Sequence, residues 1–167
     1  MTLSLSLYAP AGPSSLGRPV PVRPALRNEG PGEAWVVGVL DGSETGTRYP
    51  HWLPSIRVGE QVVAAPPAAE DPLVAPLRPS DFRRLAPGEE LDPGRLATFA
   101  VFAPAEPGTY VYSLVLSTES PRPEDWLGAL NQDPSVVELV ARVPRLTVRA
   151  EVTVEVQASR RPRRETG

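Results

Sequence analysis

The strongest structural signal in the chain is the strict alternation of apolar and polar side chains near its C-terminal end. An apolar residue occupies every even-numbered position from Leu146 to Val156, and Thr, Arg or Glu occupies each odd-numbered position between them. Because successive side chains of a strand point to opposite faces, this pattern predicts a long strand with one buried and one wet face. A strand about 36 Å long, at roughly 3.3 Å per residue, is expected to bend, to carry a bulge or to serve both sheets.

Two further segments show the same period of two. Leu3, Leu5 and Leu7 share one face of residues 3–7, and two tyrosines and two leucines share one face of residues 110–116. Both segments are predicted to be strands with a buried face.

Two other segments are predicted to be strands from their composition. Residues 20–28 contain Pro21 and Pro24, which cannot donate ladder hydrogen bonds, so this strand is predicted to lie at a sheet edge or to pair irregularly. Residues 34–40 are continuously apolar and precede the turn signal Asp41-Gly42. They are predicted to form a central strand that is covered on both sides.

Prolines limit the structure that the rest of the chain can adopt. Nine prolines between residues 43 and 94 predict long Pro-rich loops, interrupted by a short hairpin over residues 55–65. A strand is predicted at residues 95–103. Asp133-Pro134 fits an N-cap followed by the first helical position, so a short helical insertion is predicted within residues 121–144. The whole pattern predicts an all-β sandwich of about seven antiparallel strands in a single domain, residues 1–158.

Composition excludes several kinds of chemistry and partner. The 167 residues include no cysteine and no lysine, which removes disulfides, thiolate nucleophiles, cysteine-ligated metals and Schiff-base lysines. The net charge is −3, but residues 159–167 hold four arginines and one glutamate (+3), so residues 1–158 carry −6. An acidic body is a poor surface for nucleic acid, and no apolar stretch of about 18 residues is present to span a membrane. We expect neither partner, and the lack of a basic region before the first apolar residues predicts a cytoplasmic protein.

Three short motifs mark turns between the predicted strands. They are Leu26-Arg27-Asn28-Glu29-Gly30, Leu85-Ala86-Pro87-Gly88-Glu89 and Pro107-Gly108-Thr109-Tyr110. These motifs resemble the turns of bacterial immunoglobulin-like sandwich domains, including the intracellular proteinase inhibitor group. The resemblance covers residues 1–117 and 145–157 and implies an immunoglobulin-like β-sandwich. In such sandwiches a tyrosine placed like Tyr110 returns its hydroxyl to upstream backbone, an arrangement called a tyrosine corner.

Two groups of residues could form a chemical site, but each has a simpler structural interpretation. Asp41, Ser43 and Thr45 resemble the cation loop of von Willebrand A domains, yet the helix that this loop needs does not follow, so a hairpin turn is favoured. His51, the single histidine, would need a carboxylate such as that of Asp41 or Glu44 beside it to act as a base, and a packed or exposed position is favoured.

Loop carboxylates form a third group. They are Glu89, Glu90 and Asp92 in one segment and Glu119, Glu124 and Asp125 in another. Glycosidases use carboxylate pairs held about 5 to 10 Å apart, but solvated loop faces are the favoured interpretation. We therefore predict no catalytic residue, no metal ligand and no cofactor.

Aromatic and apolar side chains in two loops form the predicted interaction surface. Tyr49, His51 and Trp52 are clustered in one loop, where core filling is favoured over contact with a partner. Trp126 and Leu127 lie in the excursion 121–132, which is longer than a sandwich needs. They either plug the open end of the sandwich or face outward as an anchor.

Two functional classes agree with these observations. The first is a non-enzymatic interaction or accessory module that offers its loops or a sheet edge to an unknown protein partner. The second is a carbohydrate-active or hydrolytic protein that works through paired loop carboxylates. The missing lysine and cysteine and the single histidine favour the first class.

The basic tail, residues 159–167, has no large apolar side chain and is predicted to be disordered. Removing every residue after Gln157 should leave the melting temperature unchanged, because no buried contact is lost. Thermal unfolding of the truncated and complete chains tests this, and a decrease of several degrees would show that the tail is docked.

Overall fold

Strands dominate the part of the chain that the computed structural model describes, which is residues 2–68, 75–127 and 133–159. The basic tail from Arg160 onward lies outside these ranges, so its disorder stays a prediction. Within these ranges the longest helix spans nine residues, and none has the length and apolar character that crossing a bilayer requires.

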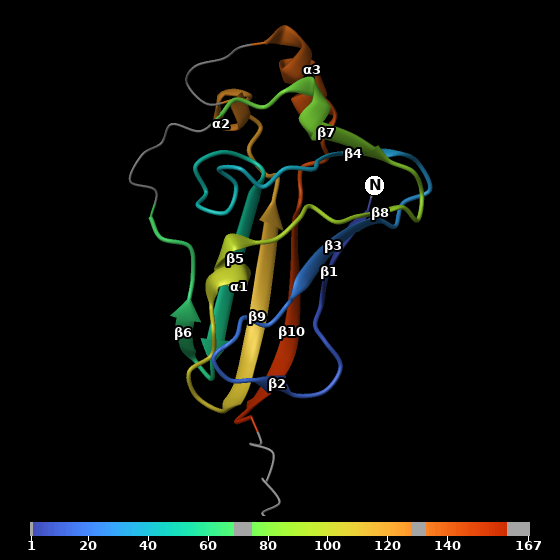
Figure 1. Cartoon of the computed structure of the whole chain (residues 1–167). Helices are drawn as coiled ribbons and strands as arrows, with labels where there is room; N and C mark the ends of the chain where they lie inside the picture. Colours follow the sequence, from blue (N-terminus) through green and yellow to red (C-terminus); the bar gives the residue numbers. More distant parts are fainter. Residues whose placement is uncertain (1, 69–74, 128–132, 160–167) are drawn as a thin grey trace, which may run out of the picture.

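The larger sheet contains five strands in the order β2, β10, β9, β5, β6. They are β2 (Ser14–Ser15), β10 (Thr147–Gln157), β9 (Gly108–Ser117), β5 (His51–Val58) and β6 (Gln61–Ala64). The pairs are antiparallel, except that the two residues of β2 run parallel to the end of β10. Figure 1 shows β5, β9 and β10 as the long central strands, with β6 beside β5 at one edge.

Two smaller sheets and the helices complete the fold. The three-stranded sheet has the order β1 (Leu3–Tyr8), β3 (Arg23–Asn28), β8 (Glu90–Leu91). A separate antiparallel pair consists of β4 (Ala34–Val37) and β7 (Phe82–Leu85). The helical elements are the 3-10 turn η1 (Pro79–Asp81) and the helices α1 (Ala97–Val101), α2 (Glu124–Leu127) and α3 (Pro134–Arg142).

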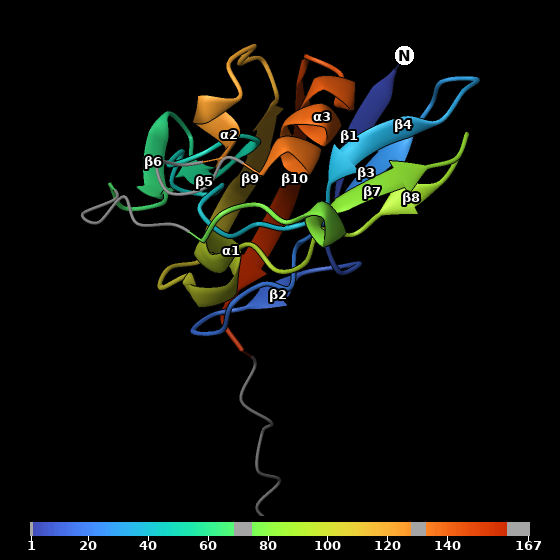
Figure 2. The same ribbon diagram turned by 90° about the horizontal axis from the view of Figure 1, so that it is seen from above.

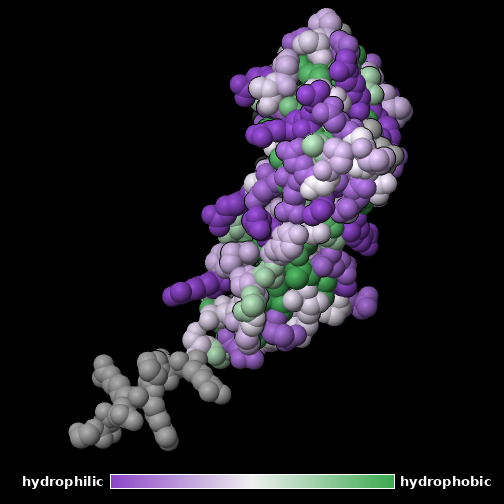
Figure 3. Space-filling model, turned by 90° about the vertical axis from the view of Figure 1, so that its right-hand side faces the viewer, coloured by the Kyte–Doolittle hydropathy of each residue, from purple (hydrophilic) through white to green (hydrophobic). Residues whose placement is uncertain are grey.

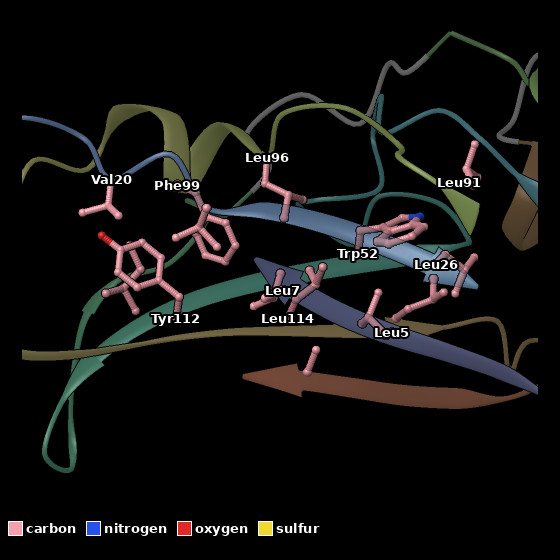
Figure 4. Packing of buried hydrophobic residues seen from close by; sticks show 14 of the residues in the cluster. Leu5, Leu7, Val20, Leu26, Trp52, Leu91, Leu96, Phe99, Tyr112 and Leu114 are labelled. Atoms are coloured by element: carbon pink, nitrogen blue, oxygen red, sulfur yellow. The ribbon is translucent and has the colours of Figure 1, made fainter. Parts of the chain in front are cut away.

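The main core lies between the five-stranded and three-stranded sheets, with α1 covering part of it. Leucines of β1 and β3 pack there against Trp52 of β5 and Tyr112 of β9, as Figure 4 shows together with Phe99 of α1. A second apolar cluster at the upper end is built from Val37, Phe82, Trp126 and residues of α3. Figure 2 looks onto this end and shows α2 and α3 over the ends of β9 and β10.

The predicted fold class is confirmed, because two facing sheets enclose one apolar layer and Tyr110 forms a tyrosine corner. Its hydroxyl donates to the carbonyl oxygen of Glu106 at 2.8 Å, the geometry expected at this position of an immunoglobulin-like sandwich. The chain is therefore an all-β, immunoglobulin-like sandwich. Its described residues form more strands than the seven expected, because several are only two to four residues long.

The alternation predicted for the last strand is confirmed by β10. Ala150, Val154 and Val156 are buried, whereas the odd-numbered residues between them are exposed. The ladder with β9 runs from Thr147 to Val156 without a register shift, so the expected bulge is absent from this pair. A register shift occurs instead between β5 and β6, near Ile56.

The helix predicted to begin at Asp133-Pro134 is also confirmed, by α3. Asp133 is the N-cap of α3, and its carboxylate accepts from the Ser135 backbone N–H at 2.9 Å. Val136 and Val140 share the buried face of this helix.

The strand predicted at residues 95–103 is wrong. This segment contains the short helix α1, in which Phe99 is buried while Val101 is 76% exposed. A short apolar run does not distinguish a strand from a single helical turn by its periodicity. The helical form places Leu96 and Phe99 in the core together.

β3 is not at a sheet edge, because it lies between β1 and β8, but its pairing with β8 covers only two residues, which agrees with the alternative of an irregular pairing. The central position predicted for β4 is wrong, because β4 pairs only with β7 among the described residues. β4 is nevertheless covered on both sides, since Val36 contacts the main core and Val37 the second cluster.

The hairpin predicted over residues 55–65 is confirmed by the antiparallel pair β5 and β6, and the Pro-rich middle also forms β7 and β8, which were not predicted. The ladders explain how prolines are accommodated. Pro54 of β5 pairs with Leu114 of β9, and β6 pairs with β5 only from Ile56 onward. Pro24 of β3 likewise pairs with β1 at a point that β8 does not reach. Each proline therefore sits where the ladder requires no N–H on the second side.

Asn28 joins the first two turn motifs. Its buried side-chain amide donates to the carbonyl oxygens of Gly32 (2.7 Å) and Leu85 (3.0 Å) and accepts from the Gly30 N–H (2.9 Å). Its backbone exchanges hydrogen bonds with Gly88 and Glu89. One residue thus fixes the end of β3 against the turn between β7 and β8.

Replacing Asn28 with alanine should destabilise the fold by about 2 to 4 kcal/mol, because three backbone groups, those of Leu85 and Gly30 buried and that of Gly32 part-buried, lose their partner at roughly 1 kcal/mol or more each. Urea unfolding measures this. The control is Glu29→Ala next to it, whose side chain makes only surface contacts with Ser4 and Arg27 and should change stability by about 0.5 kcal/mol or less. Equal effects of the two substitutions would contradict the role given to Asn28.

Candidate interaction surface

Most of the exposed large apolar side chains belong to β5 and to the two elements that contact it, β6 and α1. Among the described residues there are six, and five of them belong to β5, β6 or α1: Leu53, Val58, Val62, Val63 and Val101. Val101 is 76% exposed and Val62 58%. The face on which β3 and β8 lie is different, since Figure 3 shows it as mainly hydrophilic with a smaller hydrophobic area in its lower half.

β6 is an edge strand without charged side chains. It pairs with β5 on one side, and no strand within the described ranges pairs with its other side. Its sequence is Gln-Val-Val-Ala, whereas sheet edges are commonly protected by charges or prolines. The free backbone groups of such an edge can receive an added strand.

A groove of about 620 Å³ continues from the end of β6. Its walls come from three segments: residues 40–45, residues 64–67, and residues 97–103 of α1 and the chain after it. Apolar and small side chains line most of it, and its charged lining residues are Asp41 and Glu44. We refer to β6, this groove and Val101 as the β6–α1 surface.

The loop that forms one wall of the groove is fixed by a buried arginine. Arg48 is only 3% exposed. Its guanidinium donates through Nε to the Asp41 carbonyl oxygen at 2.8 Å, and through Nη1 to the Ala75 carbonyl oxygen at 3.2 Å. Burial lowers the pKa of Arg48, and the nearby carboxylates of Asp41 and Asp81 oppose this shift.

Glu44 ties the same loop to α1. Its carboxylate accepts from the Ala97 backbone N–H at 2.7 Å, 53 residues away along the chain. The N-cap residue of α1, Leu96, has no side-chain acceptor, so Glu44 supplies the missing one. Burial raises the pKa of Glu44, while the hydrogen bonds from the Ala97 and Thr98 amides act in the opposite direction.

The outer face of the large sheet next to β6 is polar and internally paired. Arg57 lies opposite Val62 of β6 and forms a 3.0 Å ion pair with Glu151, across β9. The Ser113 hydroxyl also donates to Glu151 at 3.0 Å. The hydrogen bond from Arg57, followed by that from Ser113, lowers the pKa of Glu151. Arg57, the cation that lies opposite β6 in the ladder, is thus already paired with Glu151.

Three of the five residues predicted for an interaction surface lie in the core. Trp52 and Trp126 are 0% exposed and Leu127 is 4% exposed. Trp52 belongs to the main core, and the other two fill the second cluster under α3. In this structure none of the three is exposed to a partner. Trp52 fills the core, which was the favoured interpretation, and the burial of Trp126 and Leu127 agrees with a plug at the open end of the sandwich, not with an outward-facing anchor.

Tyr49 and His51, the remaining two, are half-buried beside the plug. Their rings stack with centroids 3.8 Å apart, and Tyr49 lies 5.8 Å from the Trp126 ring. On another side of Trp126, the Arg145 guanidinium lies 4.7 Å from the ring centroid. Burial lowers the pKa of His51, and the Asp125 carboxylate partly opposes this. The stacked pair forms a lid on the tryptophan more than an open contact patch.

The residues that resembled a cation loop form turns. Thr45 and Thr47 share a 2.7 Å hydrogen bond, and the buried Ser43 donates its backbone N–H to Leu40. Over the described ranges, no group of three or more histidines, cysteines or carboxylates is placed to hold a metal ion. Neither Asp41 nor Glu44 is a hydrogen-bond partner of His51 there, since Glu44 binds α1 instead.

Most of the loop carboxylates make local contacts. Glu89 accepts from the Ala86 N–H and Asp92 from the Gly94 N–H, each at 2.8 Å. Asp125 accepts from the Ser120 hydroxyl. Glu124 lies 3.9 Å from Arg122. These bonds shape turns, which is the structural interpretation of the carboxylates.

Sequence reasoning missed the main components of the β6–α1 surface. The sequence pattern assigns Val101 to a strand, residues 64 and 65 to a hairpin and residues 66 and 67 to a loop, and it gives none of them a role in binding. The available signal was the run Val-Val-Ala-Ala-Pro-Pro at residues 62–67, in which an uncharged strand ends in two prolines that stop further pairing.

Comparisons with known proteins give a limited result. No protein-family model matches the sequence, and no curated protein matches it. A similar solved structure is the CARDB domain of the PF1109 protein from Pyrococcus furiosus in complex with di-metal ions, 13% identical over 95% of this chain and 94% of that one, with a TM-score of 0.36. A similarity of this size transfers neither metal ions nor a role to this chain. The resemblance to the intracellular proteinase inhibitor group finds no support in these comparisons.

Replacing Trp126 with alanine should cost about 3 to 5 kcal/mol of stability, because a fully buried aromatic side chain leaves a cavity. Trp126→Phe is the matched control, since it keeps an aromatic ring and loses mainly the 3.0 Å hydrogen bond from Nε1 to the Ser120 carbonyl oxygen. It should cost less. Chemical denaturation of both variants gives the free energies, and a Trp126→Ala variant as stable as the parent would refute the plug.

Proposed function

We propose that this chain is a non-enzymatic protein-interaction module, and that it binds its partner through the β6–α1 surface. The observation that carries the proposal is an uncharged edge strand, with Val62 and Val63 exposed, whose last residue Ala64 also lines an apolar groove that includes the exposed Val101. Exposed apolar surface is a mark of interaction sites in proteins.

Energetics support this surface over the aromatic loop residues. Burying an exposed valine side chain fully contributes about 1.5 kcal/mol or more, and Val62 and Val101 each keep more than half of their surface exposed. Trp52 and Trp126 have already used their apolar area within the fold. They therefore have no exposed area left to contribute to binding in this conformation.

The arrangement of polar groups agrees with an interaction role more than with hydrolysis. Asp92, Asp125 and Glu89 of the loop carboxylates receive hydrogen bonds from neighbouring backbone or side-chain groups. Their geometry is that of turn and cap formation. Glu44 acts in the same way on α1.

Placing charge on the proposed surface should abolish partner binding without affecting the fold. Immobilised wild-type chain and a Val62→Lys, Val101→Asp double variant are incubated with an extract of the source cells, and retained proteins are identified by mass spectrometry. The proposal expects a protein retained by the wild type to be lost from the double variant, with melting temperatures equal within about 2 °C because both sites are exposed.

The matched control is Tyr8→Ser. Among the described residues, Tyr8 is the one large exposed apolar side chain outside β5, β6 and α1, and it is 45% exposed. This variant should retain the same proteins as the wild type. A protein lost equally from both variants, or retained by all three forms, would contradict the proposed function.

A further inference from the structure

We propose that the occupant of the β6–α1 surface is an extended segment of a partner protein, which adds to β6 as a strand and places a basic side chain, Lys or Arg, at the groove. This inference rests on the proposed function and specifies the chemistry of the partner.

The strand edge determines the extended form. β6 has four residues, and no strand within the described ranges pairs with its outer edge. The length of this edge is about 13 Å at roughly 3.3 Å per residue. An added strand would hydrogen-bond to this edge and bring alternate side chains over Val62. Beyond Ala64 the prolines Pro66 and Pro67 have no N–H groups to offer, so the ladder ends there.

The groove begins where that ladder ends. Ala64 is the last residue of β6, and it lines the groove together with Ala65. A segment that leaves β6 therefore passes directly between Val101 and the loop at residues 40–45. The volume of the groove, about 620 Å³, falls within the range of roughly 300 to 1,000 Å³ typical of sites that enclose small ligands or side chains.

Charge determines the basic residue. The groove lining contains the carboxylates of Asp41 and Glu44 and no arginine. Glu44 is half-buried with one carboxylate oxygen on the Ala97 amide. Arg57, near the edge, is paired with Glu151. A Lys or Arg on the incoming segment would pair with the two carboxylates, whereas an acidic side chain would be repelled.

A second copy of this chain fits the surface less well. Two copies joined through their β6 edges would cover the valines but leave both grooves without an occupant. Residues 1–158 carry −6, so the copies would also repel each other at low ionic strength.

A random dodecapeptide library displayed on phage is selected against the complete chain. Enriched peptides are synthesised with a fluorescent label, and their binding is measured by anisotropy. The proposal expects enriched peptides with alternating apolar residues, no proline within that run, and at least one Lys or Arg. Replacing that basic residue with Glu should weaken binding about five-fold or more.

Three forms of the chain locate the bound peptide. Val63→Pro places a proline within β6 and should weaken binding at least ten-fold, while an unchanged melting temperature shows that the fold is kept. The double variant Asp41→Asn, Glu44→Gln keeps the hydrogen-bond acceptor for Ala97 and should weaken binding of the basic peptide about five-fold. It should bind the Glu-substituted peptide more tightly than the wild type does, because the repelling carboxylates are gone. Tyr8→Ser should bind as the wild type does.

Each alternative outcome is distinguishable. Enriched peptides that are acidic, or that bind the Val63→Pro variant normally, overturn this inference even if the Val62→Lys, Val101→Asp double variant loses its cellular partner, which would leave the proposed function standing. A concentration-dependent dimer in sedimentation velocity that Val62→Lys dissociates would assign the edge to a second copy. Failure of the library to yield any peptide above background would overturn the inference as well.

Discussion

The buried amide of Asn28 is the constraint that holds the β4–β7 pair against the three-stranded sheet. It connects the end of β3 with the end of β7 and with the loop after β3 through three side-chain hydrogen bonds. The β4–β7 pair is not in either larger sheet, so these bonds and the apolar contacts of Val36 and Leu85 keep it attached. A buried polar network of this kind is stabilising only when each member is satisfied, and the Asn28 side chain uses both its donors and its acceptor.

The sequence predicts those parts of the fold that depend on local pattern. Period-two alternation identifies β1, β9 and β10, because each has one face in the core. The Asp133 cap identifies α3. The failures arise where tertiary contact decides. Residues 97–101 become helical because this places Phe99 over Tyr112, with ring centroids 5.2 Å apart in an edge arrangement. β3 can be an inner strand despite Pro24, because β8 pairs with only two of its residues and both lie beyond that proline.

The candidate site could be predicted only in part, because its walls are distant in sequence. Residues 40–45, 64–67 and 97–103 meet through the Glu44 contact with Ala97 and through the edge position of β6, and neither relation has a local signature. Aromatic residues drew attention to Trp52 and Trp126 instead. Composition alone cannot separate a buried tryptophan from an exposed one, since both contribute large apolar area. A sheet edge as a contact element, by contrast, was an expectation that the residues already allowed.

The groove is held in shape by bonds that exist before any partner arrives. Arg48 fixes the loop at residues 40–45 from below through the Asp41 carbonyl, and Glu44 fixes it to α1. A preformed site avoids the cost of ordering a loop on binding, which is commonly about 0.5 to 1.5 kcal/mol for each immobilised side chain. Burial of the Glu44 carboxylate raises its pKa, while its hydrogen bonds with the Ala97 and Thr98 amides lower it. A partner cation at the groove, as proposed above, would offset the unfavourable burial of this carboxylate.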